Sequence, residues 1–498
     1  MKKIIITLSI LIYSVSAAQI FVDPNGSDLN SGTIDNPLLT IIRAMDIVQP
    51  NTIIYLREGT YYYSSTIKTL INGEENKPIK LWAYNNEKPV IDFTNQPVST
   101  NSRGIYINKN YWHIKGLEIR GAKDNGIYIT GNYNKIENCS IHNCCDTGLQ
   151  ISGGGSNNVV VNCDSYNNYD SLTLGENADG FAPKLDIGPG NAFINCRAWE
   201  NSDDGWDLYE SDDPVVITNC MAFRNGHNVW GIQNFQGDGN GFKLGGNYVS
   251  GSHIITGSIA FDNKSKGFDQ NNNTAGVILY NNTAFRNEGK NYSFTSNPNF
   301  SRHILKNNIS FQGNISIADS SIVEKNSWQG FIVSINDFLS LDTNGVTDLR
   351  NLDGEINETN FLHLNLNSMM VDAGVQVGLS YSGTAPDLGA YETIGVQVEN
   401  KSKNIFNDFK LNQNFPNPFN PITNISFSIN KSGFVNLTIY DILGNKVEEL
   451  INDYLLSGIY NTIWFANSNK NLVLSSGIYF ANLNYNFKQQ TIKMILAK

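Results

Sequence analysis

The pattern of apolar and polar positions repeats along the chain. Short apolar phrases that end in a small polar residue recur six times: Ile136-Glu-Asn-Cys139, Val160-Val-Asn-Cys163, Phe193-Ile-Asn-Cys196, Ile217-Thr-Asn-Cys220, Ile255-Thr-Gly-Ser258 and Leu279-Tyr-Asn-Asn282. The last residues of successive phrases lie 24, 33, 24, 38 and 24 positions apart. A repeat of this length is typical of a solenoid, in which each repeat packs on its neighbours.

A second phrase, which opens on glycine, follows most copies of the first. Its copies are Gly148-Leu-Gln-Ile151, Gly180-Phe-Ala-Pro183, Gly205-Trp-Asp-Leu208, Gly241-Phe-Lys-Leu244 and Gly267-Phe-Asp-Gln270. They alternate with the period of two that strands require. A unit of several short strands with Asn and Gly turns predicts one coil of a right-handed parallel β-helix, with coils about 4.8 Å apart. We therefore predict an all-β fold, with this β-helix over residues 19–393.

The repeat places equivalent residues in columns. Cysteines form one column (Cys139, Cys163, Cys196 and Cys220), and asparagines five positions later form another (Asn168, Asn201, Asn225, Asn263 and Asn287). We expect the cysteines to point inward unpaired, because adjacent coils are slightly too far apart for a relaxed disulfide, whose Cβ atoms lie about 3.8 Å apart. We expect the asparagine amides to bond up and down the stack.

Different patterns flank the repeat. Leu38 to Val48, after Asn36-Pro37, has helical apolar spacing and is predicted to cap the open end of the solenoid. Residues 326–392 keep short apolar runs and turns. The polar stretch Glu399–Asn404 indicates a linker over residues 394–408. Strand-like runs over residues 409–498, such as Phe434–Tyr440, then predict a small β-sandwich.

The N-terminus has the layout of a secretory signal. Two lysines follow Met1, an apolar run covers Ile4–Val15, and Ser16-Ala17-Ala18 ends it in small residues, so residues 1–18 are predicted to be a signal peptide. No other segment approaches the run of about 18 apolar residues that spans a membrane. We therefore expect an exported, soluble, monomeric protein.

The charge balance excludes one class of partner. Lys and Arg number 35 against 46 Asp and Glu, for a net charge of −11, which disfavours a nonspecific nucleic-acid binder held by phosphate contacts. If the partner is itself anionic, positive charge must be supplied locally.

Aligning the glycine phrases brings five charged residues onto one outer surface. Asp179 and Asp204 stand one position before the glycine, Asp203 is beside Asp204, and Asp207 and, on the next coil, Lys243 stand two positions after it. Because side chains alternate along a strand, Asp207 and Lys243 are predicted to point outward, while the aromatic residue before each points inward.

These residue types indicate a calcium-binding site beside a general base. Stacked carboxylates repel one another unless a cation neutralises them, and an all-oxygen set suits Ca²⁺, which takes about 6 to 8 oxygen ligands. We predict a Ca²⁺ site at Asp179, Asp203, Asp204 and Asp207. A calcium ion beside a lysine fits β-elimination from a uronate polymer, in which the metal acidifies the proton next to the carboxylate and Lys243 removes it. Calcium would also let an acidic protein bind an acidic polysaccharide.

The phrases around these residues resemble those of the polysaccharide lyase family 9 pectate lyases. They are Asn177-Ala-Asp-Gly-Phe-Ala182, Pro189-Gly-Asn191, Asn201-Ser-Asp-Asp-Gly-Trp-Asp207 and Gly239-Asn-Gly-Phe-Lys-Leu-Gly245, within a resemblance that extends over most of residues 20–392. The resemblance implies a ten-coil-type β-helix, calcium on the four aspartates, Lys243 as the base, and cleavage of α-1,4-galacturonan (polygalacturonate). Pro183 departs from the small residue expected there and is predicted to bend its strand.

The C-terminal region resembles the sorting domain of the type IX (Por) secretion system. The resemblance lies in Asn414-Phe-Pro-Asn-Pro-Phe-Asn-Pro421, Tyr440-Asp-Ile-Leu-Gly444, Ser476-Gly-Ile-Tyr-Phe480 and Lys493-Met-Ile-Leu-Ala-Lys498. It implies export by the type IX machinery, followed by release or attachment to the outer surface.

Two other functions stay open. A β-helix glycoside hydrolase of the polygalacturonase type would use paired aspartates such as Asp203 and Asp204, but the sequence lacks Gly-His-Gly near them and hydrolysis gives Lys243 no role. A noncatalytic carbohydrate-binding or adhesin solenoid would use calcium for structure alone. Trp206, Trp230, Tyr209 and Lys184 are weaker site candidates, for which packing or surface roles are expected.

Overall fold

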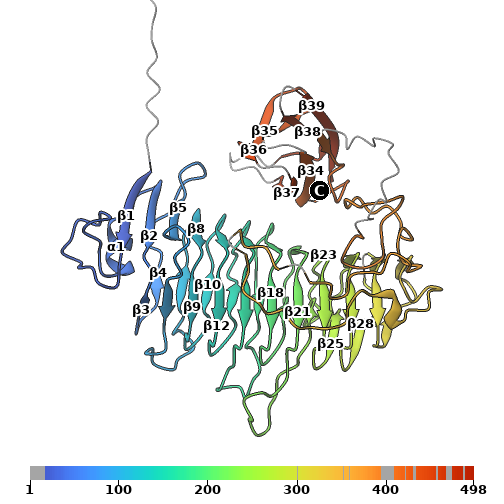
Figure 1. Ribbon diagram of the computed structural model, residues 1–498, viewed down its shortest axis with the longest axis horizontal. Helices are drawn as coiled ribbons and strands as arrows, with labels where there is room; N and C mark the ends of the chain where they lie inside the picture. Colours follow the sequence, from blue (N-terminus) through green and yellow to red (C-terminus); the bar gives the residue numbers. More distant parts are fainter. Residues whose placement is uncertain are drawn as a thin grey trace, which may run out of the picture.

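The computed structural model describes residues 17–299, 301–351, 353–357, 359–393, 409–420, 422–429, 433–455, 458–466, 474–485 and 488–497. Residues 18–324 form a parallel β-helix, the described residues after them up to 393 lie against it, and the segments after residue 408 form a separate small domain (Figure 1). The predicted linker, residues 394–408, and residues 1–16 of the predicted signal peptide lie outside the described residues. These boundaries therefore stay predictions.

Three parallel sheets run the length of the β-helix, and each coil contributes one strand to a sheet. The first sheet contains, in spatial order, β1 (Ala18–Val22), β2 (Thr52–Leu56), β5 (Ile79–Ala83), β8 (Trp112–Lys115), β11 (Lys135–Glu137), β14 (Val159–Val161), β17 (Ala192–Ile194), β20 (Val216–Thr218), β23 (Ile254–Thr256), β26 (Ile278–Tyr280), β29 (Ile304–Lys306) and β32 (Ile322–Glu324). The second contains β4 (Ile67–Lys68), β7 (Ile105–Ile107), β10 (Ile127–Ile129), β13 (Leu149–Ile151), β16 (Phe181–Pro183), β19 (Trp206–Asp207), β22 (Phe242–Lys243), β25 (Lys266–Asp269), β28 (Lys290–Phe294) and β31 (Ile315–Ile317). The third contains β3 (Thr60–Tyr62), β6 (Val90–Asp92), β9 (Glu118–Arg120), β12 (Ser140–His142), β15 (Asp164–Tyr166), β18 (Arg197–Trp199), β21 (Met221–Phe223), β24 (Ile259–Phe261), β27 (Thr283–Phe285) and β30 (Ile309–Phe311).

The inner face of the second sheet carries a stack of aromatic rings. Phe181, Trp206, Phe242, Phe268 and Tyr292 are fully buried, and successive ring centroids lie 4.8, 4.8, 4.9 and 5.1 Å apart. These separations match the coil spacing, so one ring per coil fills the core behind the outer face.

Both predicted columns are present. Cys139, Cys163, Cys196 and Cys220 are buried and unpaired, as expected. The asparagine amides bond from coil to coil: Asn201 Nδ2 donates to Asn225 Oδ1 at 3.0 Å, and Asn225 Nδ2 donates to Asn263 Oδ1 at 2.9 Å. The asparagine column therefore satisfies buried turn groups that have no strand partner.

A short helix covers the N-terminal end of the core. α1 (Ile41–Ile47) lies within the predicted segment 38–48 and is shorter because Thr40 caps it, accepting a hydrogen bond from the Arg43 amide. Its buried side chains, Ile41, Ala44 and Met45, join the core of the β-helix.

The segment after β32 covers the outer face of the third sheet. It contains the 3₁₀ helix η1 (Ile335–Asp337). The ring of Phe361 lies 4.7 Å from Phe261, and that of Phe338 lies 5.1 Å from Phe311. The apolar runs predicted for residues 326–392 therefore belong to a covering layer.

The C-terminal domain is a sandwich of two antiparallel sheets, as predicted. One sheet contains β33 (Phe409–Leu411), β34 (Ile422–Ile429) and β37 (Gly458–Phe465), and the other contains β36 (Lys446–Leu455), β35 (Gly433–Asp441), β38 (Gly477–Tyr485) and β39 (Lys488–Leu496). Its core shares no residue with that of the β-helix. The two domains meet where the ring of Phe415 lies 5.3 Å from that of Tyr280. Within the described segments, no helix is long and apolar enough to cross a membrane.

Candidate metal centre and active site

The candidate site lies on the outer face of the second sheet, where β16, β19 and β22 are neighbours. Asp179 precedes β16, Asp203 and Asp204 precede β19, and Asp207 of β19 pairs in register with Lys243 of β22. The aromatic residue before each of Asp207 and Lys243 is fully buried. The predicted alternation is therefore confirmed, and it aims the charged side chains away from the core.

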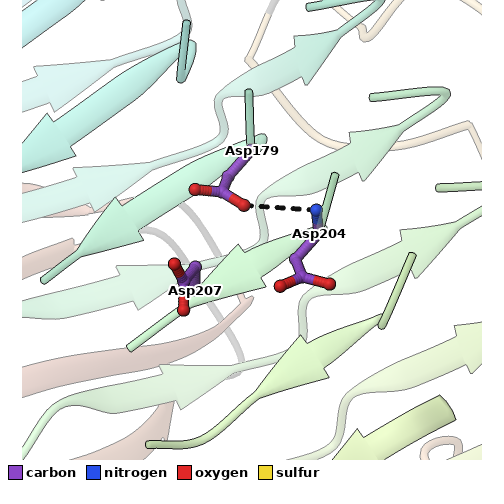
Figure 2. A group of neighbouring side chains, drawn as sticks. All are labelled: Asp179, Asp204 and Asp207. Atoms are coloured by element: carbon purple, nitrogen blue, oxygen red, sulfur yellow. Dashed lines mark hydrogen bonds between the residues drawn. The ribbon is translucent and has the colours of Figure 1, made fainter. Parts of the chain in front are cut away.

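Three of the four predicted metal ligands converge. Asp179, Asp204 and Asp207 each offer a carboxylate oxygen, and the three oxygens lie within 4.8 Å of one another (Figure 2). The Asp204 amide donates to Asp179 Oδ1 at 3.2 Å, which holds the two coils in register. All three side chains are buried, so their charges are poorly screened by water.

Asp203 is engaged differently. Its Oδ1 accepts a hydrogen bond from the Asp238 amide at 2.6 Å, and its Oδ2 accepts one from the Asn177 amide at 3.0 Å. Asp203 also forms a second acidic group with Asp204 and Asp238. It therefore ties two loops to the site while lying next to the three converging carboxylates.

Two lysines balance the carboxylates. Lys243 Nζ lies 3.2 Å from Asp204 Oδ2 and 3.6 Å from Asp207 Oδ1. Lys184 Nζ lies 2.7 Å from Asp179 Oδ2 and 3.0 Å from Asp207 Oδ2. Both lysines are more than nine-tenths buried, so Lys184 is an internal counter-ion of the cluster.

Burial is the largest influence on the pKa values of the aspartates, and it raises them. It raises the pKa of Asp179 to about 8 and that of Asp203 to about 6, and it raises the pKa of Asp204 well above its usual range. Asp207 is also buried, but the neighbouring charges of Lys184 and Lys243 lower its pKa below the usual value. The cluster therefore retains protons at neutral pH when no metal is bound.

The same carboxylates hold Lys243 in its charged form. Burial alone would lower its pKa, yet Asp204, Asp207 and Asp203 together raise the pKa above that of an ordinary lysine. Lys243 is thus protonated when no metal is bound.

The donor set fits a calcium ion. Asp204 Oδ2 is buried and has no hydrogen-bond partner within the described residues, although charged Lys243 lies nearby. An unpartnered buried carboxylate oxygen is costly unless a cation uses its lone pair. An all-oxygen set of this kind suits a hard cation such as Ca²⁺.

The residues that the sequence offered as weaker site candidates have different roles in the structure. Lys184 belongs to the site, whereas Trp206 is a core residue. Trp230 stacks on Tyr169 at 5.1 Å in the loops. Asp238, which sequence reasoning missed, lies 3.4 Å from Lys243 Nζ; it sits in a loop outside the repeat, where register gives no signal.

Pro183 affects the strand pairing on one side of β16 only. It pairs in register with Ile151 of β13, so β16 continues through it on that side. On the other side β16 pairs with β19 at Phe181 alone. Because proline has no amide hydrogen, it ends the ladder toward the metal-site strand.

Comparison with known proteins identifies the family of this chain and several relatives. Residues 20–314 match the family described as Pel9A-like, right handed beta helix region. Pectate lyase L of Dickeya dadantii is 44% identical over 384 residues, which cover 75% of this chain and 90% of that protein. Pectate lyase L of Paenibacillus polymyxa is 40% identical, with 73% and 85% covered.

Solved structures agree with the sequence relatives. The crystal structure of pectate lyase Pel9A superposes with a TM-score of 0.72 at 44% identity, covering 75% of this chain and 96% of that one. A rhamnogalacturonan lyase superposes with a TM-score of 0.64 at 29% identity, covering 70% and 97%. Residues 413–497 match the secretion system C-terminal sorting domain.

Proposed function

This chain belongs to the Pel9A-like right-handed β-helix family, and from that membership we propose that it is a calcium-dependent pectate lyase with Lys243 as its general base. It is a polysaccharide lyase, like the pectate lyases it resembles over three quarters of its length. The C-terminal sorting domain directs it out of the cell, to release or to attachment at the outer surface. The proposed route is the type IX secretion machinery.

The observation that carries this proposal is the register of Lys243 with Asp207, beside an Asp204 oxygen that has no hydrogen-bond partner within the described residues. Asp179, Asp204 and Asp207 would hold the calcium ion, with Asp203 alongside. A bound calcium ion supplies charge that attracts a uronate carboxylate and acidifies the adjacent C–H bond.

The chain's own residues then carry the proton transfer. Neutral Lys243 Nζ takes the proton from the carbon next to the substrate carboxylate. The electron pair left behind forms a carbon–carbon double bond, the glycosidic C–O bond breaks, and the leaving oxygen takes a proton from water. Lys243 reaches its neutral form when the carboxylates that raise its pKa are engaged by a cation.

The test is the ultraviolet absorbance of polygalacturonate incubated with the full chain, with Ca²⁺ or with a chelator. We expect a calcium-dependent rise from the conjugated product. Lys243→Ala should lower the rate by about 10²- to 10⁴-fold, as expected when a general base is removed, and should keep calorimetric Ca²⁺ binding. Lys306→Ala, which removes a lysine paired with Glu324 on the first sheet, is the matched control.

Other outcomes identify other functions. New reducing ends without absorbance would indicate a hydrolase, and binding without cleavage would indicate a carbohydrate-binding solenoid. Rhamnogalacturonan is assayed in parallel, because one structural relative is a rhamnogalacturonan lyase.

A further inference from the structure

An outward-facing row of the second sheet runs from the candidate metal site toward the N-terminal end of the β-helix. Strand register, extended by one residue from the Phe181–Trp206 pair, places its members one coil apart, in the order Lys243, Asp207, Ala182, Gln150, Tyr128, Tyr106 and Lys68. At about 4.8 Å per coil, Tyr128 lies about 14 Å and Lys68 about 24 Å from Asp207 along the row. The far part of this row has no role in the chemistry described above.

Arg103 lies over the aromatic part of the row. Its guanidinium carbon is 3.5 Å from the ring centroid of Tyr128 and 5.5 Å from that of Tyr106. Its backbone is fixed, because its carbonyl accepts hydrogen bonds from Thr66 Oγ1 at 2.7 Å and Gln96 Nε2 at 2.8 Å. The guanidinium therefore lies over the Tyr128 ring and near the Tyr106 ring, on a backbone that side-chain hydrogen bonds hold in place.

This guanidinium forms an ion pair with Asp124, but its Nε donates no hydrogen bond within the described residues. The Nε lies 3.4 Å from Asp124 Oδ2. Arg197, Arg286 and Arg350 differ, since each donates at least two hydrogen bonds to an aspartate. Burial also raises the pKa of Asp124 to about 7, which weakens its competition for the guanidinium.

We propose that Arg103, stacked on Tyr106 and Tyr128, is a remote subsite that binds the carboxylate of a uronate unit about three to five units from the cleaved bond. Arginine stacked on aromatic faces leaves its edge free for bidentate recognition of a carboxylate. The half-buried tyrosines offer part of their apolar surface to a sugar ring, and exposed Lys68 adds positive charge at the end of the row. The proposal rests on the proposed function, because it takes the substrate to be a uronate polymer lying along this row.

The test compares full-length wild type and Arg103→Gln on oligogalacturonides of increasing length. Removing the guanidinium that binds a remote carboxylate should lower kcat/KM about tenfold for oligomers longer than about five units. It should leave kcat/KM unchanged for trimers, which cannot span the row. An equal decrease at every length, or no decrease at any length, would overturn the proposal.

A matched control separates this subsite from general effects of removing an arginine. Arg286 also stacks on an aromatic ring, 4.2 Å from the centroid of Phe285, but it lies on the third sheet and pairs with Asp262. Arg286→Gln should therefore show wild-type kcat/KM at all lengths. Arg103→Lys, which keeps the charge and removes the planar fork, should recover part of the activity on long oligomers.

A binding measurement distinguishes failure of the subsite from failure of the proposed function. Calorimetry with an octagalacturonate and Ca²⁺ compares Lys243→Ala with the double variant Lys243→Ala/Arg103→Gln. Weaker binding by the double variant supports the subsite even if wild type cleaves no uronate, which would refute the lyase assignment alone. Equal octamer affinity in the two proteins would overturn the subsite.

Discussion

Asp179 and Asp204 retain protons at neutral pH because they are buried, whereas Asp203, whose pKa is raised only to about 6, is protonated only at lower pH. Metal binding requires deprotonated carboxylates, so calcium competes with protons here. Because the pKa values of Asp203 and Asp179 are raised, these carboxylates lose their protons as the pH rises through about 6 and about 8, and calcium affinity increases over that range. Asp207 adds no such dependence in this range, because its pKa is lowered.

We therefore predict that, while the pH is below the pKa of a ligand carboxylate, each such carboxylate makes calcium affinity rise by up to about tenfold per pH unit. Calorimetry across this pH range measures the affinity, and buffers of different ionisation enthalpy measure the protons released. Thermal unfolding in chelator at each pH serves as the control for folding. Constant affinity with no proton release would mean that the carboxylates are already ionised in the metal-free protein.

Residue spacing predicted the positions of those site residues that lie within the repeat. Asp207 and Lys243 occupy equivalent positions of neighbouring coils, so period-two alternation places both on the outer face. Lys184 follows Pro183 after the strand, and its approach to Asp179 depends on how that turn is packed. Spacing alone does not determine such a turn, and so the sequence leaves Lys184 as one weak candidate among several.

At the scale of elements, the asparagine column replaces strand pairing in the turns. The Asn225 side chain accepts from the Asn201 amides at 3.0 and 3.1 Å, and donates to Asn263 at 2.9 Å and to the Ala198 carbonyl at 3.2 Å. It is fully buried, so its removal leaves several polar groups without a partner.

We predict that Asn225→Ala lowers the free energy of unfolding by about 3 kcal/mol, the cost of leaving buried donors and acceptors unsatisfied. Denaturant titration followed by circular dichroism measures it. Asn86→Ala, at an exposed position, should change the stability by no more than about 0.5 kcal/mol. A similar small change for Asn225→Ala would show that water satisfies the column instead.

The columns were predictable because equivalent residues recur at a fixed place in each coil. The segment over the third sheet was harder to place, because its apolar residues have no period. Phe338 and Phe361 find their partners across long stretches of chain, and such contacts leave no local pattern in the sequence.

At the scale of the whole molecule, catalysis and export belong to separate cores. No residue is shared between the described cores of the β-helix and the sandwich. The described contacts between them include the Phe415–Tyr280 ring pair and the hydrogen bond between Ser380 and Ser426 at 3.0 Å. None of these residues belongs to the metal site.

We therefore predict that a fragment of residues 17–393 cleaves polygalacturonate with the turnover of the full chain, since domains with their own cores fold alone. Initial rates of absorbance measure it. Phe415→Ala in the full chain, which removes the ring contact without removing the domain, should also keep full turnover. An inactive but folded fragment would mean that the sandwich supports the site.

The helix at the N-terminal end of the β-helix has a consequence for assembly. The strand edges of a first coil are open to further hydrogen bonding, so an uncovered solenoid end can accept a coil from another molecule and grow into a filament. α1 buries Ile41, Ala44 and Met45 across that end. The free edge of β1 is itself occupied by the segment before the helix, because Leu38 donates to the Phe21 carbonyl at 2.8 Å and Asp23 donates to the Leu38 carbonyl at 2.9 Å. The helix and the segment before it therefore oppose filament growth from this end, which matters most when secretion concentrates many copies outside the cell.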